Sequence, residues 1–90
     1  MSGGYFNGSE YWFEEIENGI VDLIKSNNDD NWYDQKTIEQ FSIGAKMAAI
    51  ARVYAMRIDY LVSGDDGEDT FHKRLAEELK EVEDRYAGKI

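Results

Sequence analysis

The chain has 90 residues, no cysteine and a single histidine, and its formal net charge is −9 at pH 7. The lack of cysteine excludes disulfides and thiolate metal sites, and one histidine excludes a histidine-rich metal cluster. A domain this small buries only about 60% of its unfolded surface, so oligomerisation is the reinforcement left to it.

The charge is distributed unevenly along the chain. Residues 1–34 carry −7, residues 35–62 carry +2 and residues 63–90 carry −4. The acidic flanks argue against direct binding to nucleic acid and against binding to anionic membrane surfaces. No secretory signal is visible at the start, and residues 43–62 contain too many charged side chains for a membrane span. We therefore expect a soluble, cytoplasmic protein.

The first third of the chain predicts an arm, a helix and a turn. Residues 1–8 combine three glycines with the pair Tyr5-Phe6, which indicates an irregular arm that docks on the domain. A helix over residues 9–26 follows from apolar residues at spacings of three and four, namely Phe13, Ile16, Ile20, Leu23 and Ile24. The run SNNDDN, Ser26–Asn31, predicts a solvated turn.

A long helix is predicted over residues 35–62, with Asp34 as its N-cap. Its bulky apolar residues fall on one face: Ile43, Met47, Ile50, Tyr54, Ile58 and Leu61. Its small residues fall roughly opposite: Ala45, Ala48, Ala49 and Ala55. We expect the bulky face to receive the other two helices and the alanine face to be the interface of a homo-oligomer.

After this helix, Gly64 suits a left-handed C-cap, and Asp65 or Asp66 can cap a third helix over residues 67–87. That helix has one narrow apolar stripe: Phe71, Leu75, Leu79, Val82 and Tyr86. No segment alternates with the period of a strand. The sequence therefore predicts a single all-α domain, a three-helix bundle with a long central helix, assembled as a homo-oligomer.

No catalytic, metal or cofactor site is predicted. The acidic loop at residues 65–69 lacks the spacing of a calcium-binding EF-hand, and no nucleophile is arranged with His72. We therefore expect a protein that is not an enzyme.

Lys46, Arg52 and Arg57 are the most informative polar residues, because they interrupt the most apolar segment. Two interpretations are open. The cations form ion pairs with the acidic first and third helices, or, with Tyr54 and Tyr60, they line a cavity for an anionic ligand. Arginine binds phosphates through paired hydrogen bonds and aromatic rings stack on bases, so the ligand class would be a nucleotide.

Two stretches, MSGGYF at residues 1–6 and RIDYLVSGDDGEDTFHKRL at residues 57–75, resemble a group of small uncharacterised proteins of phages and phage-rich bacterial genomes. The resemblance covers 25 of the 90 residues. It implies a phage or prophage accessory protein in the cytoplasm of a host cell. It carries no activity and no site residue.

Small phage proteins without enzymatic activity commonly bind and disable a host component. The first hypothesis is a homo-oligomer that sequesters a host-derived nucleotide signal of a defence system at the central cations. The alternative is an acidic mimic of nucleic acid that inhibits a host defence protein. A third possibility is a structural or assembly protein without a ligand.

Overall fold

The computed structural model describes residues 4–30 and 32–88, and there the chain forms three helices. Helix α1 spans Tyr11–Asp30, α2 spans Gln35–Val62 and α3 spans Glu68–Tyr86. The prediction of an all-α three-helix fold is confirmed. Parts of two predictions, residues 1–3 of the arm and Asn31 of the turn, lie outside the described residues.

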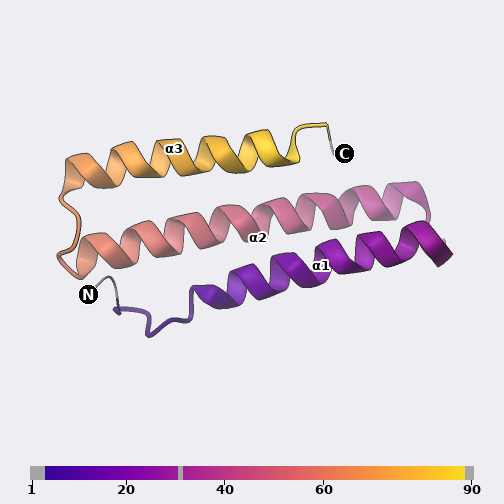
Figure 1. Cartoon of the computed structure of the whole chain (residues 1–90), viewed down its shortest axis with the longest axis horizontal. Coiled ribbons are helices and arrows are strands. Elements are labelled where there is room, and N and C mark those ends of the chain that lie inside the picture. The colour runs from indigo at the N-terminus through magenta and orange to yellow at the C-terminus, as the bar shows by residue number, and fades with distance from the viewer. Residues whose placement is uncertain (1–3, 31, 89–90) are drawn as a thin grey trace.

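The three helices lie side by side in one layer, with α2 in the middle (Figure 1). Both α1 and α3 pack on α2, and within the described residues they do not pack on each other. The Cα atoms extend over 47 × 25 × 15 Å. The middle value, 25 Å, matches the width of three helices placed side by side with their axes about 8–10 Å apart. Helix α2 is therefore flanked on two sides and left open on two faces.

Helix α1 begins two residues later than predicted because the chain bends just before it. Asn7 and Gly8 both have positive φ, 55° and 80°, a backbone conformation that interrupts a right-handed helix. A series of short turns follows, in which the N–H of Tyr11 donates to the carbonyl of Gly8 at 3.1 Å. Regular α-helical structure starts only after these turns.

The turn predicted from Ser26 is wrong as far as Asp30, because α1 continues through these residues. Asn27 is buried, and its side chain binds the backbone of Tyr33 across the α1–α2 connection. The N–H of Tyr33 donates to Asn27 Oδ1 at 2.8 Å, and Asn27 Nδ2 donates to the Tyr33 carbonyl at 3.2 Å. The side chain thus bonds to a partner six residues ahead, so it does not compete with its own helix.

Both ends of α2 follow the local signals. The N–H of Thr37 donates to Asp34 Oδ1 at 2.9 Å, which confirms the predicted N-cap. Gly64 adopts φ 84°, the left-handed conformation predicted for it. The predicted caps of α3 are wrong, because Gly67 occupies the N-cap position and no side chain bonds there. Asp66 instead pairs with Arg57.

The two predicted faces of α2 are not covered in the way that was expected. Ala45 and Ala49, assigned to an oligomer interface, are buried within the single chain at 0% and 3% exposure. Ala48 and Ala55 are half-buried. On the bulky face, Met47 is 51% exposed, and Tyr54 and Ile58 are also exposed. Small side chains allow α1 and α3 to approach α2 closely on one side, and two flanking helices cannot cover the other.

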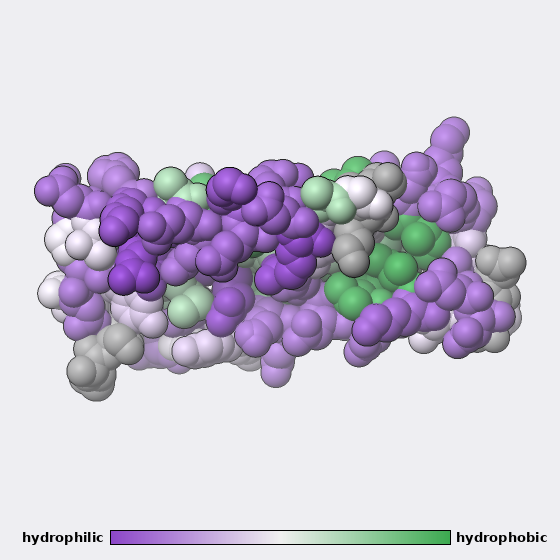
Figure 2. All heavy atoms as spheres, turned by 45° about the horizontal axis from the view of Figure 1, so that its top comes forward, coloured by the Kyte–Doolittle hydropathy of each residue, from purple (hydrophilic) through white to green (hydrophobic). Residues whose placement is uncertain are grey.

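The buried apolar core of the described chain is small: Ile38, Ala45, Ala49, Val53 and Val82. Val82 of α3 packs with Ala49 and Val53. On the other flank, the Cδ1 atom of Ile20 in α1 lies 3.8 Å from the position that a Cβ at Gly44 would take. Helix α3 is shorter than α2, and Figure 2 shows hydrophobic surface (green) beyond the C-terminal end of α3.

Candidate functional site

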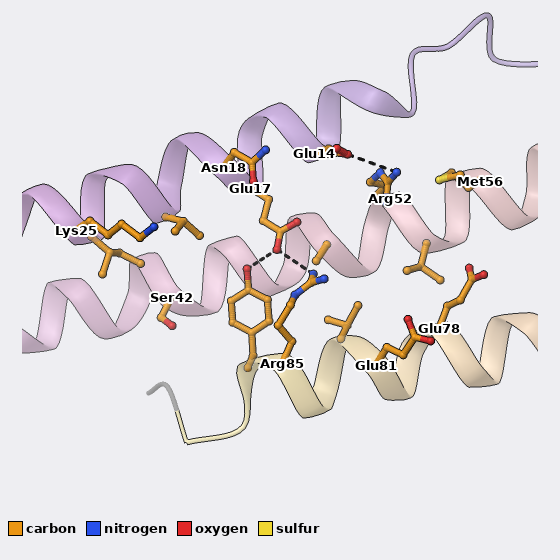
Figure 3. A pocket seen from close by; sticks show the side chains of 16 residues that line it. Glu14, Glu17, Asn18, Lys25, Ser42, Arg52, Met56, Glu78, Glu81 and Arg85 are labelled. Atoms are coloured by element: carbon orange, nitrogen blue, oxygen red, sulfur yellow. Dashed lines mark hydrogen bonds and ion pairs between the residues drawn. The ribbon is translucent and has the colours of Figure 1, made fainter.

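A groove of about 890 Å³ runs between α1 and α3, with α2 as its floor. Figure 3 shows Glu14 and Glu17 from α1, Arg52 from α2 and Arg85 from α3 gathered in this groove. Its charged lining comprises four acids and three bases: Glu14, Glu17, Glu78 and Glu81, with Lys25, Arg52 and Arg85. The groove therefore holds nearly balanced charge rather than the excess of cations that an anionic ligand requires.

The three cations predicted to bind a ligand are each paired with a carboxylate of the same chain. Lys46 Nζ lies 2.8 Å from Glu83 Oε1, an oxygen of α3. Arg52 lies 3.4 Å from Glu14 of α1. Arg57 is the most enclosed of the three, with a side chain 11% exposed.

Arg57 joins the end of α2 to the loop and to α3. Its Nη1 atom donates to Asp66 Oδ2 at 3.2 Å, and its Nε atom lies 3.4 Å from Glu78 Oε1. Its guanidinium also lies over the ring of Tyr60, 4.5 Å from the centroid. These contacts come from three different segments, so Arg57 holds the α2–α3 connection in place.

The five residues predicted for ligand binding do not come together in one place in the single chain. Arg57 and Tyr60 are in contact, and Lys46 lies on the same flank of α2, towards α3. Arg52 turns to the α1 flank, where it pairs with Glu14 and approaches the ring of Tyr11 at 5.8 Å. Tyr54 follows Arg52 by two residues, which places it on roughly the opposite side of the helix.

Glu17 makes a polar connection between α1 and α3 across the groove. It accepts hydrogen bonds from Arg85 Nη2 at 3.0 Å and from the hydroxyl of Tyr86. Burial, this hydrogen bond and the negative charge of Glu17 raise the pKa of Tyr86 to about 12. The sequence interpretation placed Tyr86 only in the apolar stripe and did not foresee its partner.

Asp59 is the most deeply buried large side chain of the described residues, at 1% exposure, and its role was not predicted. Its carboxylate accepts the backbone N–H groups of Tyr5 at 3.1 Å and Phe6 at 3.3 Å. The hydroxyl of Ser63 also donates to it at 3.1 Å. Burial acts to raise the pKa of Asp59, but these hydrogen bonds outweigh it and hold the pKa below its ordinary value.

The signal for this role was present in the sequence. Asp59 is a lone acid within an apolar helical segment, and Ser63 follows at the i,i+4 spacing. A buried carboxylate requires donors, and an irregular arm that docks on the domain has backbone N–H groups that no helix uses. Glu10 is a second buried carboxylate, and its Oε1 atom has no hydrogen-bond partner among the described residues.

Comparisons with family models, with curated proteins and with solved structures found no match. Within residues 4–30 and 32–88, no cluster of three or more His, Cys, Asp or Glu side chains is arranged to hold a metal ion. None of the described helices is both long and apolar enough to cross a membrane. The candidate sites thus remain the groove, the Asp59 carboxylate and the surfaces of the helical layer.

Proposed function

We propose that this protein is a non-catalytic binding protein built on its long central helix, and that it acts as a homo-oligomer whose acidic surface occupies a basic site on a host protein. The observation that carries the proposal is the pairing of Lys46, Arg52 and Arg57 with carboxylates of the same chain. The unpaired cations were the reason to favour a nucleotide ligand, and that reason no longer applies.

The negative charge that these internal ion pairs leave on the protein favours a basic partner. Ion pairs also engage Lys80 and Arg85, so five of the ten basic side chains are neutralised internally. The net charge of −9 therefore has to be carried largely by the outer surfaces. A concentrated negative surface speeds encounter with a basic groove and excludes acidic competitors. In the phage setting that the sequence resemblance implies, the target would be a nucleic-acid-binding defence protein.

The test is capture of a partner from host lysate on the immobilised protein. Capture should weaken strongly as salt rises to roughly 0.5 M, where the Debye length falls to about 4 Å. A duplex DNA oligonucleotide should compete for the captured protein, because the mimic and DNA would share one site. A partner that resists both salt and DNA would overturn the proposal.

The variants for this test lie on α3. The double substitution Glu77→Gln and Glu81→Gln removes two exposed negative charges, and it should reduce capture. Lys73→Gln on the same helix is the matched control, since it removes an exposed positive charge and should not reduce capture. Equal loss of capture in both variants would contradict the proposal, because the sign of the removed charge would then have no effect on capture.

Nucleotide sequestration remains the second candidate, and one observation favours it. Arg52 Nε is buried beside the groove and has no hydrogen-bond partner among the described residues, although the guanidinium pairs with Glu14. The volume of about 890 Å³ is in the range of small-ligand pockets. Calorimetry with a panel of cyclic nucleotides tests it, with Arg52→Ala to remove binding and exposed Arg74→Ala as the control. The absence of any heat of binding would eliminate this candidate.

A further inference from the structure

Eight large hydrophobic side chains of α1 and α2 are exposed on the single chain, and six of them lie on one side of the layer. We call this set the uncovered face: Trp12, Ile16, Leu23, Met47, Tyr54 and Ile58. Their exposed fractions range from 37% at Ile58 to 69% at Trp12. Monomeric proteins rarely present a contiguous apolar patch of this kind without a partner for it.

The six side chains lie on one side of the layer, opposite the groove. On α1, the residues that line the groove include Glu14, Glu17 and Val21. At 3.6 residues per turn, Ile16 and Leu23 project roughly 130–150° away from that stripe. The same geometry turns Met47 and Ile58 of α2 roughly 160–180° away from the α2 residues that form the groove floor. The two adjacent helices thus contribute to one continuous apolar surface.

From this surface we infer that a second copy of the chain covers the uncovered face, giving a symmetric dimer of two helical layers with the grooves on the outside. The inference rests on the homo-oligomer in the proposed function and assigns its interface. Helical domains are built from at least two packed layers around a core, and one chain supplies only one layer. The second layer completes the core that five buried apolar residues leave small.

The dimensions of the layer suit such a dimer. Its faces extend 47 × 25 Å between the outermost Cα atoms. A stable interface needs roughly 800 Å² from each partner, which is less than the area of this face. In a two-fold contact the same patch meets itself, so an apolar patch is complementary to its own copy.

The net charge of the chain is compatible with a second copy on this face. Each chain carries −9, so two copies repel unless they meet through a surface without charge. The six residues of the uncovered face are uncharged, and the acids Glu14, Glu17, Glu78 and Glu81 lie in the groove on the other side. A dimer through this face also presents two identical grooves to solvent.

The test measures mass and dissociation by light scattering and analytical ultracentrifugation. The wild-type chain should show twice its mass of 10.4 kDa. Met47→Glu and Leu23→Glu should each raise the dimer dissociation constant roughly 100-fold or more, because each dimer would bury two unpaired charges. Trp32→Glu, at a 79% exposed position outside the face, should leave the dimer unchanged. Circular dichroism verifies that the variants stay helical.

Cross-linking gives an independent result if the charged variants fail to fold. The chain has no cysteine, so a single introduced cysteine can be linked only to another copy. Met47→Cys and Tyr54→Cys should yield a covalent dimer with a short thiol cross-linker, and Glu81→Cys, at an exposed position that lines the groove, should not. A monomeric wild-type chain, a dimer insensitive to both charged variants, or equal cross-linking at Glu81 would overturn the inference. Salt-sensitive capture of a host protein by a monomer would overturn this inference and the homo-oligomer, but it would still support the acidic binding surface of the proposed function.

Discussion

The carboxylate of Asp59 in α2 accepts the backbone N–H of Tyr5, which lies 54 positions earlier in the chain, at 3.1 Å. With Phe6 and Ser63 as further donors, this one side chain fixes the N-terminal arm against the C-terminal end of α2. The arm is therefore part of the fold, because its backbone donors satisfy a charge that α2 would otherwise bury alone.

Asp59→Asn tests this relationship. The amide keeps the shape of the carboxylate but loses the charge and one acceptor, so the N–H of Tyr5 or Phe6 is left without a partner. We expect a clear fall in the urea midpoint of unfolding and faster proteolysis within the arm. Ser63→Ala removes one donor and leaves the two backbone bonds, so it should lower the free energy of unfolding by only about 1 kcal/mol. Equal effects of the two substitutions would contradict this account.

The pH dependence of stability has a defined sign at Asp59. Its pKa in the folded chain lies below the ordinary value of 3.8, so the unfolded chain binds a proton first as the pH falls. The stabilisation is present above about pH 4 and is lost progressively as the pH falls towards the folded pKa. Unfolding free energies measured across this range should fall more steeply for the wild type than for Asp59→Asn. Asp34 adds a similar contribution, because the N–H and side chain of Thr37 lower its pKa.

The Asn27 side chain that connects α1 to Tyr33 should contribute substantially to stability. Asn27→Ala removes both part-buried hydrogen bonds to the backbone of Tyr33, which together should contribute roughly 1–3 kcal/mol. The neighbouring Asn28→Ala is the matched control, since Asn28 is exposed, and it should change stability little. Chemical unfolding followed by circular dichroism measures both. Because alanine has a higher helix propensity than asparagine, propensity cannot explain a loss, and equal effects of the two substitutions would contradict the role given to the bonds with Tyr33.

The hydroxyl of Tyr86 should titrate well above the ordinary range of a tyrosine. Its pKa is raised to about 12, and the bond from its hydroxyl to Glu17 is one cause. Glu17→Gln should lower that pKa towards the ordinary value near 10. The stabilisation linked to this shift is present below about pH 10 and is lost as the pH rises through 12. Ultraviolet titration of tyrosinate, compared with Tyr86→Phe, measures the shift, and an unchanged curve in Glu17→Gln would contradict it.

Burial of the alanines can be tested by enlarging one of them. Ala45 is fully buried, so Ala45→Leu should overpack the core and cost roughly 1–3 kcal/mol. Ala76→Leu at an exposed position of α3 should be nearly neutral in thermal unfolding. If Ala45→Leu were as stable as the wild type, the alanine face would be open rather than buried.

The sequence alone determined the features that depend on local physics. Apolar spacing of three and four residues predicted three helices, Asp34 predicted the start of α2, and Gly64 predicted the left-handed end. These signals act within a few residues, because capping bonds and backbone conformations are local. They did not require knowledge of the neighbours in space.

Only the tertiary structure decided which polar groups meet and which face of α2 is covered. Asn27 stays helical because Tyr33 lies across the connection, and Asp59 is tolerated because the arm returns to it. Arg52 and Arg57 were predicted either to pair or to bind a ligand, and the tertiary structure places Glu14 beside Arg52 and Asp66 beside Arg57. Apolar residues on all sides of α2 indicate only that it needs surrounding elements. The direction of approach of α1 and α3, set by close packing over Ala45 and Ala49, determines which side stays open.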